Sequence, residues 1–320
     1  MVGNKETPAA SSAARQRGKN VRVALILQGE ISDQSWNAVG YHGLAGAKEK
    51  LGIETAYRES VKPLENEVAF CDFARQGYDL VIGHGSGFSE AAVKAAEKCP
   101  ETLFAVTNSD VTGPNLAGLD TKNEEMGYLA GYIAGLLSKS KVVAFIGGMK
   151  IVAMTRAERG FIAGAKAASP DCDTLTAYIG TIDTEEVGRK IGLDLIAQKA
   201  DVLFNNAEIA GLGLMKAAEE QGVLAIGNDC DQKAVAPGAI VTSILINMTP
   251  MILSIVQEVV DDAFKPEAVR RYGFDTGTYD LAPLDLSRVS QAQADKIDAV
   301  KAQLIAGEIK FSRPSASSEA

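Results

Sequence analysis

The chain is poor in the residues that metal and redox sites require. Its 320 residues include two histidines and four cysteines. Two histidines exclude a multi-histidine metal site, and the cysteine spacings fit neither a CxxC redox pair nor a zinc pattern. The sequence therefore predicts no metal ion and no cofactor, and it assigns the cysteines a structural role.

Signatures of common enzymes are missing as well. The sequence contains no GxSxG nucleophile elbow, no HExxH zinc-binding helix and no P-loop. A Gly-rich stretch at residues 83–87 lacks the GxGxxG spacing of a dinucleotide fingerprint, and it follows the third predicted strand instead of the first. These absences favour a protein that catalyses no reaction.

Long apolar runs and excess positive charge are also absent. No segment approaches the ~18–20 consecutive apolar residues of a membrane-spanning helix. The net charge of −9 argues against a nucleic-acid partner and against a basic membrane-binding face. Residues 1–20 are polar and contain neither the apolar core of a signal peptide nor a lipobox cysteine, so we expect a disordered leader there.

What the chain does contain is an alternation of apolar, β-rich runs with amphipathic helical patterns. Repeated βα units of this length predict parallel sheets with helices on both faces. Because the pattern occurs twice, the predicted fold is α/β, with two doubly wound parallel-sheet lobes joined by a multi-crossing hinge. The predicted strands are residues 21–27, 53–57, 80–83, 103–107, 116–119, 142–146, 175–178, 202–205, 223–227 and 240–244. The predicted helices are residues 37–51, 64–76, 89–98, 124–138, 156–168, 184–199, 211–221, 250–263 and 291–306.

The domain boundaries follow from where this pattern restarts. A hinged two-lobe clamp needs short segments that cross between the lobes and absorb the change in backbone angles. We expect these crossings near residues 120–123, 243–247 and 273–283. The predicted N-terminal lobe is residues 21–121 plus 247–273, and the predicted C-terminal lobe is residues 122–246 plus 274–320.

Ligands of open parallel sheets bind beyond the carboxyl ends of the strands. After the first predicted strand, Asp33, Trp36 and Asn37 form a candidate polar clamp with a stacking ring, which suits a small ring-bearing or polyol ligand. The alternative is that Ser32 or Asp33 only caps the following helix, and that Trp36 lies in the core.

Other candidate contacts in the first lobe follow the third and fourth strands. Glycines around His84 let the backbone approach a ligand, and amides at a helix start can bind an anion. We therefore include His84, Ser86, Phe88 and Asn108 among the candidates. A lone histidine is more often structural, so His84 also has a purely structural interpretation.

The second lobe supplies the matching strand ends. The candidates there are Met149, Asn206, Glu208 and Asp229. Asp229 and Asp231 together are also compatible with a calcium loop or with a carboxylate pair for acid–base hydrolysis, and we favour hydroxyl binding by Asp229. Arg156, at a helix start, belongs to a solvated face, to an ion pair between the lobes, or to the ligand site.

Six short motifs at these positions, in order along the chain, resemble those of a known family. The chain is similar, from about residue 21 to residue 311, to the basic-membrane-protein group of ABC-transporter solute-binding lipoproteins, of the purine-nucleoside-receptor type. The motifs are residues 32–37 (SDQSWN, like D-x-S-F-N), 76–83 (QGYDLVIG), 129–131 with 145–149 (LAG and FIGGM), 160–164 (GFIAG), 227–232 (GNDCDQ) and 307–310 (GEIK).

This resemblance implies a type I periplasmic-binding fold and delivery of a small ligand to the membrane permease of an ABC importer. It implies a periplasmic or cell-surface-anchored monomer whose ligands include purine nucleosides, with the base held by aromatic rings and the ribose by carboxylates. The residues at matching positions are Asp33, Trp36, Asn37, Phe88, Asn108, Gly147, Met149 and Asp229.

Two departures from the family pattern bear on the ligand. Residues 207–211 (AEIAG) stand where the family often has Gly-Gly-Thr-Gly, and Ile246 and Asn247 follow Leu245 where it often has a lysine that contacts ribose. A nucleoside, a free base, another heterocycle and a sugar or other polyol therefore all stay open as ligands.

The favoured function is the solute-binding component of an importer that closes two lobes on a small polar ligand. The alternative enzyme is a nucleoside or sugar hydrolase that uses Asp229 and Asp231, and the missing catalytic motifs argue against it. The sensing domain of a regulator shares this fold, but a DNA-binding headpiece of about 60 residues has no room in the ~20 residues before the first strand.

Overall fold

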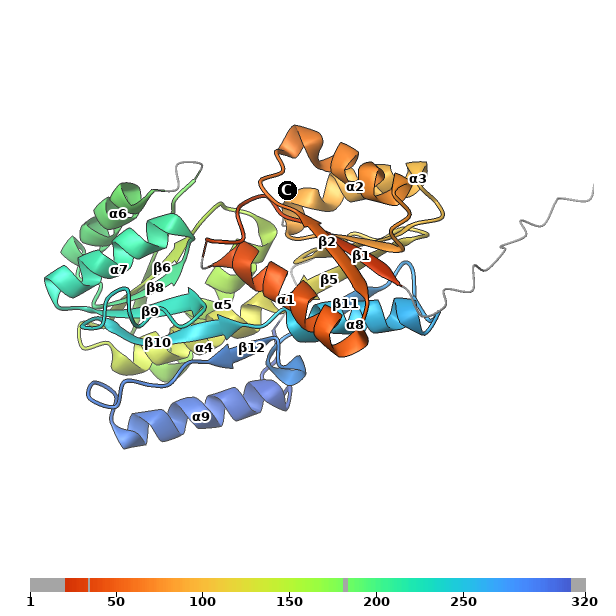
Figure 1. The fold of residues 1–320 in the computed structure, drawn as a ribbon. Helices are drawn as coiled ribbons and strands as arrows, with labels where there is room; N and C mark the ends of the chain where they lie inside the picture. The colour runs from red at the N-terminus through yellow and green to blue at the C-terminus, as the bar shows by residue number, and fades with distance from the viewer. Residues whose placement is uncertain (1–20, 34, 181–183, 312–320) are drawn as a thin grey trace, which may run out of the picture.

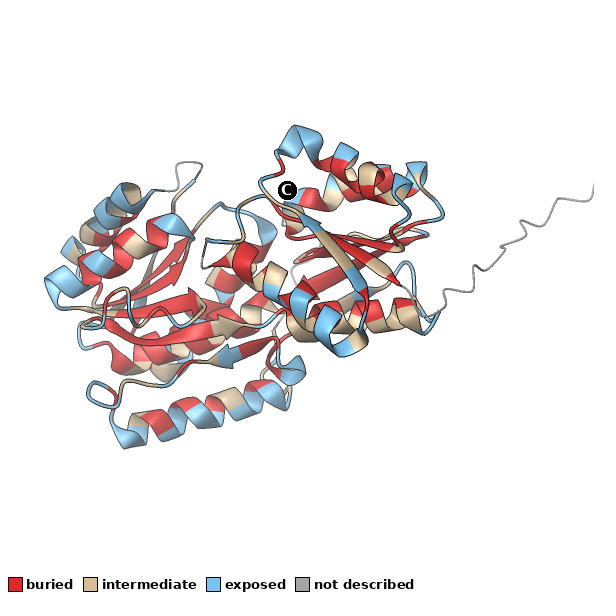
Figure 2. Ribbon diagram, viewed as in Figure 1, coloured by how far each residue is buried: buried red, intermediate tan, exposed pale blue. Residues whose placement is uncertain are grey.

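The computed structural model describes residues 21–33, 35–180 and 184–311, and it shows two α/β lobes side by side (Figure 1). The leader expected at residues 1–20 lies outside the described residues. Within them, each lobe contains one six-stranded sheet. Figure 2 shows both sheets buried between layers of helices whose outer faces are exposed. This is the two-lobed, doubly wound α/β class that the sequence predicts.

The first sheet is parallel throughout, with strand order β11-β5-β4-β3-β1-β2. Its inner strands are continuous apolar runs because helices cover both faces. One face packs against α1 (Trp36–Leu51) and α8 (Thr249–Val260), and the other against α2 (Asn66–Arg75) and α3 (Ser89–Lys98). The strands are β1 (Arg22–Ile26), β2 (Glu54–Arg58), β3 (Leu80–Gly83), β4 (Leu103–Thr107), β5 (Leu116–Thr121) and β11 (Val269–Tyr272).

The second sheet repeats this arrangement, with strand order β12-β10-β9-β8-β6-β7. Helices α4 (Asn123–Leu137), α5 (Val152–Ala168) and α9 (Gln291–Ile305) cover one face. Helices α6 (Glu185–Ala197) and α7 (Ile209–Gln221) cover the other. The strands are β6 (Val142–Gly147), β7 (Asp173–Tyr178), β8 (Val202–Asn206), β9 (Leu224–Asp229), β10 (Ile240–Ile246) and β12 (Tyr279–Leu281). Short 3-10 turns are η1 (Pro63–Glu65), η2 (Ser86–Phe88) and η3 (Phe274–Thr276).

Two short strands, β11 and β12, were not expected from the sequence, which predicts only a crossing at residues 273–283. β11 lies in the first sheet and β12 in the second, so the crossing runs through η3 between them. β12 pairs with β10 in antiparallel fashion, unlike the parallel pairs predicted. The reason is connectivity, because β10 runs toward the hinge whereas β12 begins at the hinge and runs away from it.

The chain passes between the lobes three times, after β5, after β10 and between β11 and β12. In each sheet, the strand order reverses next to its first strand, at β1/β3 and at β6/β8. Such a reversal leaves the loops at the carboxyl ends of two neighbouring strands on opposite faces, and ligands bind in the crevice between those loops. The fold therefore directs attention to the loops that follow β1, β3, β6 and β8.

Helices α4 and α5 approach each other more closely than side chains would permit. A Cβ placed on Gly131 would lie 2.0 Å from the Phe161 carbonyl oxygen, and one on Gly164 would lie 2.0 Å from the Tyr128 carbonyl oxygen. The obstacle in each case is backbone, which cannot rotate away. The glycines of this interface are therefore required by packing, although glycine is a poor helix former.

We expect Gly131→Ala to destabilise the protein by about 3 kcal/mol, because a core this close-packed cannot accept an extra methyl group. Helix propensity alone predicts the opposite sign, since alanine is favoured over glycine by about 1 kcal/mol in a helix. Urea unfolding measures the effect. The matched control is Gly148→Ala, where nothing lies within 4 Å of the added Cβ and stability should change little. A Gly131→Ala protein as stable as wild type would contradict this account.

Candidate functional site

A direct hydrogen bond joins the carboxyl ends of the two sheets across the lobes. The Ser35 hydroxyl, in the loop between β1 and α1, donates a hydrogen bond of 2.5 Å to Oδ2 of Asp229, the last residue of β9. The candidate site is built around this contact, because its neighbours are the strand-end residues predicted from the sequence.

The loop after β1 is braced by its own polar side chains. The Asp33 carboxylate accepts hydrogen bonds from the backbone N–H groups of Ser35, Asn37 and Ala38 at 2.8–3.0 Å, and from Asn37 Nδ2 at 2.7 Å. Asn37 Oδ1 accepts from Gly29 N–H at 3.0 Å. Asp33 thus caps the N-terminus of α1, as the structural alternative proposed, and with Asn37 it fixes the loop that carries Ser35 and Trp36.

The Trp36 ring is stacked on the His84 ring, with centroids 4.2 Å apart and planes 17° apart. His84 is 1 % exposed, and a Cβ on Gly40 would come within 2.6 Å of its ring, so α1 lies directly against it. The Trp36 side chain is only partly buried. It therefore presents an immobilised aromatic ring, one face of which is covered by His84.

The hydrogen bonds of His84 define its protonation state. His84 Nε2 lies 2.9 Å from the Trp36 carbonyl oxygen, which only accepts, so Nε2 carries the proton. The Thr107 hydroxyl, 2.9 Å from Nδ1, donates to the imidazole and accepts from Gly85 N–H. Burial lowers the pKa of His84 to about 4, and the Trp36 carbonyl and Asp33 act more weakly in the opposite direction. His84 is thus a neutral structural support for Trp36.

The other three first-lobe candidates lie in three different environments. Phe88 is fully buried, with its ring edge-on to Phe70 in the core beneath α2 and α3, and so packs away from Ser35. Ser86 is half-buried at the start of η2. Asn108 Oδ1 accepts from the Thr121 hydroxyl and from Asn123 Nδ2, at 2.5 and 2.8 Å, so its carbonyl is engaged at the first crossing.

Asp229 is the electrostatic centre of the second lobe. Its backbone has a φ of 70°, in the left-handed region that non-glycine residues rarely adopt. Its carboxylate accepts from the Ser35 hydroxyl and from Asn228 Nδ2 at 2.9 Å. Burial raises the pKa of Asp229 to about 6, while the Ser35 hydroxyl opposes that shift and Asp33 adds to it. A carboxylate held in this way is suited to binding hydroxyl groups.

The Asn228 amide links Asn206 to the Asp229 carboxylate, because its Nδ2 donates to both side chains. Asn206 Oδ1 accepts from Asn228 Nδ2 at 2.9 Å, and both residues are more than nine-tenths buried. Within the described residues, Asn206 Nδ2 and Asn228 Oδ1 have no hydrogen-bond partner. Leaving a buried polar atom unpaired costs about 1–3 kcal/mol. What sets this pair apart is its position, because both amides lie at the carboxyl ends of neighbouring strands, where ligands of this fold bind.

The remaining second-lobe candidates are exposed. Met149 is 54 % exposed in the loop between β6 and α5, and Glu208 is exposed at the start of α7. Asp231 is also exposed, and its carboxylate accepts from Lys233 N–H within a turn. In the described part of the chain, no group of three or more His, Cys, Asp or Glu side chains is placed to hold a metal ion.

Arg156 joins the two lobes at the hinge. Its Nη1 donates to both carboxylate oxygens of Asp120, each at 2.9 Å, and its Nη2 donates to Glu124 at 2.6 Å. Asp120 is the penultimate residue of β5 in the first sheet, whereas Arg156 lies on α5 of the second lobe. Of the three interpretations of Arg156, the structure therefore supports an ion pair between the lobes.

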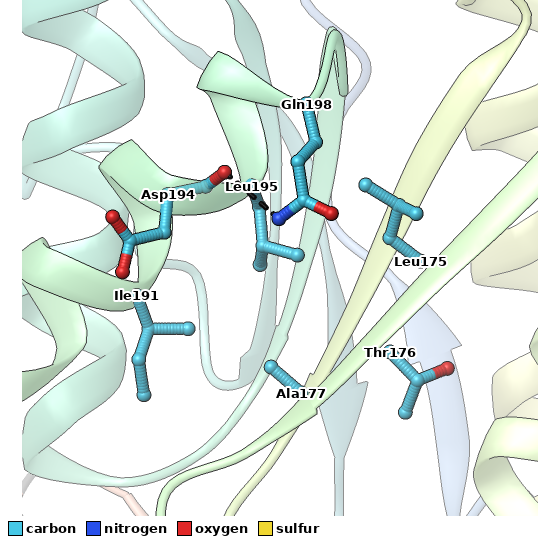
Figure 3. A pocket seen from close by; sticks show the side chains of 7 residues that line it. All are labelled: Leu175, Thr176, Ala177, Ile191, Asp194, Leu195 and Gln198. Atoms are coloured by element: carbon cyan, nitrogen blue, oxygen red, sulfur yellow. Dashed lines mark hydrogen bonds between the residues drawn. The ribbon is translucent and has the colours of Figure 1, made fainter.

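A separate groove of about 250 Å³ lies on the second lobe, between the edge strand β7 and helix α6 (Figure 3). Its residues come from the middle of β7 and the second half of α6, whereas the candidate site lies at the carboxyl ends of the strands. None of the predicted site residues lines it. The lining residues are Leu175, Thr176, Ala177, Ile191, Asp194, Leu195 and Gln198.

Sequence reasoning missed three residues of the site. Ser35 and Asn228 lie in motifs where a neighbouring aspartate or tryptophan was predicted as the ligand contact instead. Thr107 is the last residue of β4 and was predicted only as part of a strand. The signal for Asn228 was available, because it immediately precedes Asp229 at a strand end. The signal for Ser35 was weaker, since a serine before a helix is expected as a cap, and here its hydroxyl instead reaches the other lobe.

With the site described, comparison with known proteins identifies the family. The family model described as "ABC transporter substrate-binding protein PnrA-like" matches residues 20–313. The chain belongs to this family. As a PnrA-like substrate-binding protein, it is a non-enzymatic component of an ABC transporter that acts outside the cytoplasm, binds a small molecule and works with a permease. No helix in the described residues combines the length and apolarity needed to span a bilayer.

Relatives agree with this assignment, and solved structures share the fold. Basic membrane protein A of Borreliella burgdorferi is 31% identical over 233 residues, which cover 69% of this chain and 67% of that protein. Transcriptional activator protein med of Bacillus subtilis is 28% identical, covering 72% and 73% of the two chains. An Aeropyrum pernix solute-binding protein has a TM-score of 0.82 at 21% identity, covering 93% of this chain and 95% of that chain. A D-allose-bound solute-binding protein of Actinobacillus succinogenes has a TM-score of 0.67 at 14% identity, covering 84% and 99%.

His84 makes the stability of the PnrA-like fold depend on pH. The unfolded chain takes up a proton at His84 near pH 6.5, whereas the folded protein resists protonation until about pH 4. The stability due to neutral His84 is therefore complete above pH 6.5 and is lost as the pH falls toward 4, by up to about 3 kcal/mol. Urea unfolding at pH 7 and pH 5 should show a smaller loss for His84→Asn than for wild type. Equal losses in the two proteins would show that His84 is not held neutral.

Asp229 couples contact between the lobes to proton uptake. Burial raises its pKa to about 6, and exposure to water on separation of the lobes would return it toward the ordinary value of 3.8. The lobe-to-lobe contact therefore binds a proton more tightly, so the free energy of closure becomes less favourable as the pH rises from 3.8 through 6, by up to about 3 kcal/mol in total. Small-angle scattering should give a smaller radius of gyration at pH 5 than at pH 7.5. Asp229→Asn should abolish this difference, and a difference that persists in the variant would assign it to another group.

Proposed function

We propose that this substrate-binding protein takes a purine nucleoside, or a related heterocycle that carries hydroxyl groups, between its two lobes. We further propose that it works as a monomer, in the periplasm or anchored at the cell surface, and presents the closed form to the permease of an ABC importer. The observation that carries the ligand assignment is the pairing of an immobilised Trp36 ring on one lobe with a hydroxyl-binding Asp229 on the other.

Each half of this pairing matches one part of a nucleoside. The partly buried face of Trp36 offers a stacking surface for a planar heterocycle. The Asp229 carboxylate already accepts a hydrogen bond from the Ser35 hydroxyl, and a ligand hydroxyl can donate to it in the same way. Because the two groups lie on different lobes, a ligand that engages both holds the lobes together and shifts the equilibrium toward the closed form.

A sugar without a heterocycle is the second candidate. It is favoured by the departures at residues 207–211 and 246–247, which remove expected nucleoside-family features, and by the D-allose-binding protein that shares the fold. A sugar would use Asp229 in the same way and would stack its apolar face on Trp36. The two candidates differ in whether the heterocycle contributes to affinity.

Thermal unfolding with a ligand panel tests the assignment. Adenosine, inosine and guanosine at about 1,000 times their dissociation constants should stabilise the protein by about 4 kcal/mol, whereas ribose and allose should have a much smaller effect. Trp36→Ala should weaken nucleoside binding by a factor of about 10–100, because a stacked ring contributes about 1–3 kcal/mol. Trp36→Phe should retain most of the affinity, and Tyr57→Ala, an exposed aromatic outside the site, should retain all of it. Stabilisation by sugars alone would reassign the ligand, and unchanged affinity in Trp36→Ala would place the ring outside the site.

A further inference from the structure

Two amide side chains stand side by side at the carboxyl edge of the second sheet. In the β8–β9 pairing Phe204 lies opposite Ile226, so Asn206 and Asn228 are the next pair on the same face. Asn206 is also aligned with Gly147 on β6, and Asn228 with Ile244 on β10. The amide pair therefore lies beside the reversal of strand order, where the fold directs ligands.

The orientation of both amides is fixed by their neighbours. Asn228 Nδ2 donates to Asn206 Oδ1 and to Asp229 Oδ1, each at 2.9 Å, so turning the Asn228 amide over would face its carbonyl toward two acceptors. The groups without a partner in the described residues are consequently the Asn206 NH2, a donor, and the Asn228 carbonyl, an acceptor. Turning both amides together would still leave one donor and one acceptor unpaired.

We propose that Asn206 and Asn228 recognise two neighbouring hydroxyl groups of the ligand, one accepting from Asn206 Nδ2 and the other donating to Asn228 Oδ1. This inference rests on the proposed function and specifies which part of the ligand the second lobe reads. The chemical class is a vicinal diol, on the ribose of a nucleoside or on a sugar ring.

The neighbourhood of the pair favours a diol over the edge of a base. Asp229 directly follows Asn228, and its carboxylate accepts a hydrogen bond from the Ser35 hydroxyl. This part of the second lobe therefore already binds a hydroxyl group. A hydroxyl can both donate and accept, so adjacent hydroxyls can satisfy an unpaired donor, an unpaired acceptor and a carboxylate together. The stacking ring for the heterocycle, Trp36, lies on the opposite lobe.

The test compares matched ligands that differ by one hydroxyl. Isothermal titration of wild type with adenosine, 2′-deoxyadenosine and 3′-deoxyadenosine, and with the inosine series, should show affinity at least about tenfold lower for each deoxy ligand. The double variant N206L/N228L removes both amides with side chains of similar shape. It should bind the ribonucleoside as weakly as wild type binds the deoxy ligand, and its preference for ribose over deoxyribose should disappear.

Two controls separate recognition from damage to the fold. The double variant should unfold close to the wild-type temperature, because the loss of two unpaired buried atoms offsets the loss of the hydrogen bonds from Asn228 Nδ2 to Asn206 and to Asp229. Thr174→Val removes another buried, unpaired hydroxyl, at the opposite end of the second sheet, and should leave affinity for every ligand unchanged. If N206L/N228L does not fold, the single isosteric variant Asn206→Asp replaces the donor with an acceptor and should show the same loss of preference.

The outcomes distinguish this inference from the proposed function. Binding of nucleosides with equal affinity for ribo and deoxy forms, or an unchanged preference in the variants, would overturn the diol inference and leave the nucleoside function standing. An equal loss of affinity for the free base hypoxanthine in the variants would also overturn it, by assigning the amides to the base edge. Absence of binding to any nucleoside or sugar by wild type would instead overturn the proposed function itself.

Discussion

The two lobes are joined beside the first crossing by a buried ion pair between Asp120 and Arg156. Both side chains are largely removed from water, at 3 % and 14 % exposure, so either charge left alone would be strongly destabilising. Arg271 on β11 adds a second guanidinium 3.1 Å from Asp120. Because desolvation raises the pKa of Asp120 while both arginines oppose that shift, the carboxylate depends on its partners to stay ionised. This cluster therefore ties the first sheet to α5 of the second lobe beside the first crossing.

On either side of this hinge the two lobes treat their polar groups differently. In the first lobe, Asp33, Asn37 and His84 are occupied by hydrogen bonds within the loop and the helix start, which makes the Trp36 platform rigid. In the second lobe, one polar atom each of Asn206 and Asn228 has no hydrogen-bond partner within the described residues. The polar groups around Trp36 are thus largely satisfied, whereas those beside Asp229 are not. Under the proposed function, the first lobe would set the shape of the site and the second its polar selectivity.

The sequence was sufficient for the fold because strand and helix patterns are local, and most inner strands of the two sheets are largely buried apolar runs. It was insufficient for β11 and β12, which are three or four residues long and form only because a neighbouring strand offers an open edge. Within the candidate site, the strand-end rule predicted Asp229, Asn206 and Trp36, which the structure places near the contact between the lobes. It could not show that the polar atoms of Asp33 are consumed in capping, or that Phe88 turns into the core, because those outcomes depend on the direction of a side chain. The Ser35–Asp229 contact joins residues 194 positions apart, which no local pattern encodes.

The three crossings also determine the order in which the molecule can be built. The first sheet has its last strand, β11, and one covering helix, α8, encoded after five strands of the second lobe. During synthesis the first lobe therefore emerges with an open sheet edge at β5 and an uncovered apolar face. More than 100 further residues are synthesised before α8 and β11 can cover them. The second lobe likewise lacks α9 until the chain is nearly finished. Neither lobe is an independent folding unit along the chain, so the hinge that permits motion in the finished protein also makes completion of each half conditional on the other.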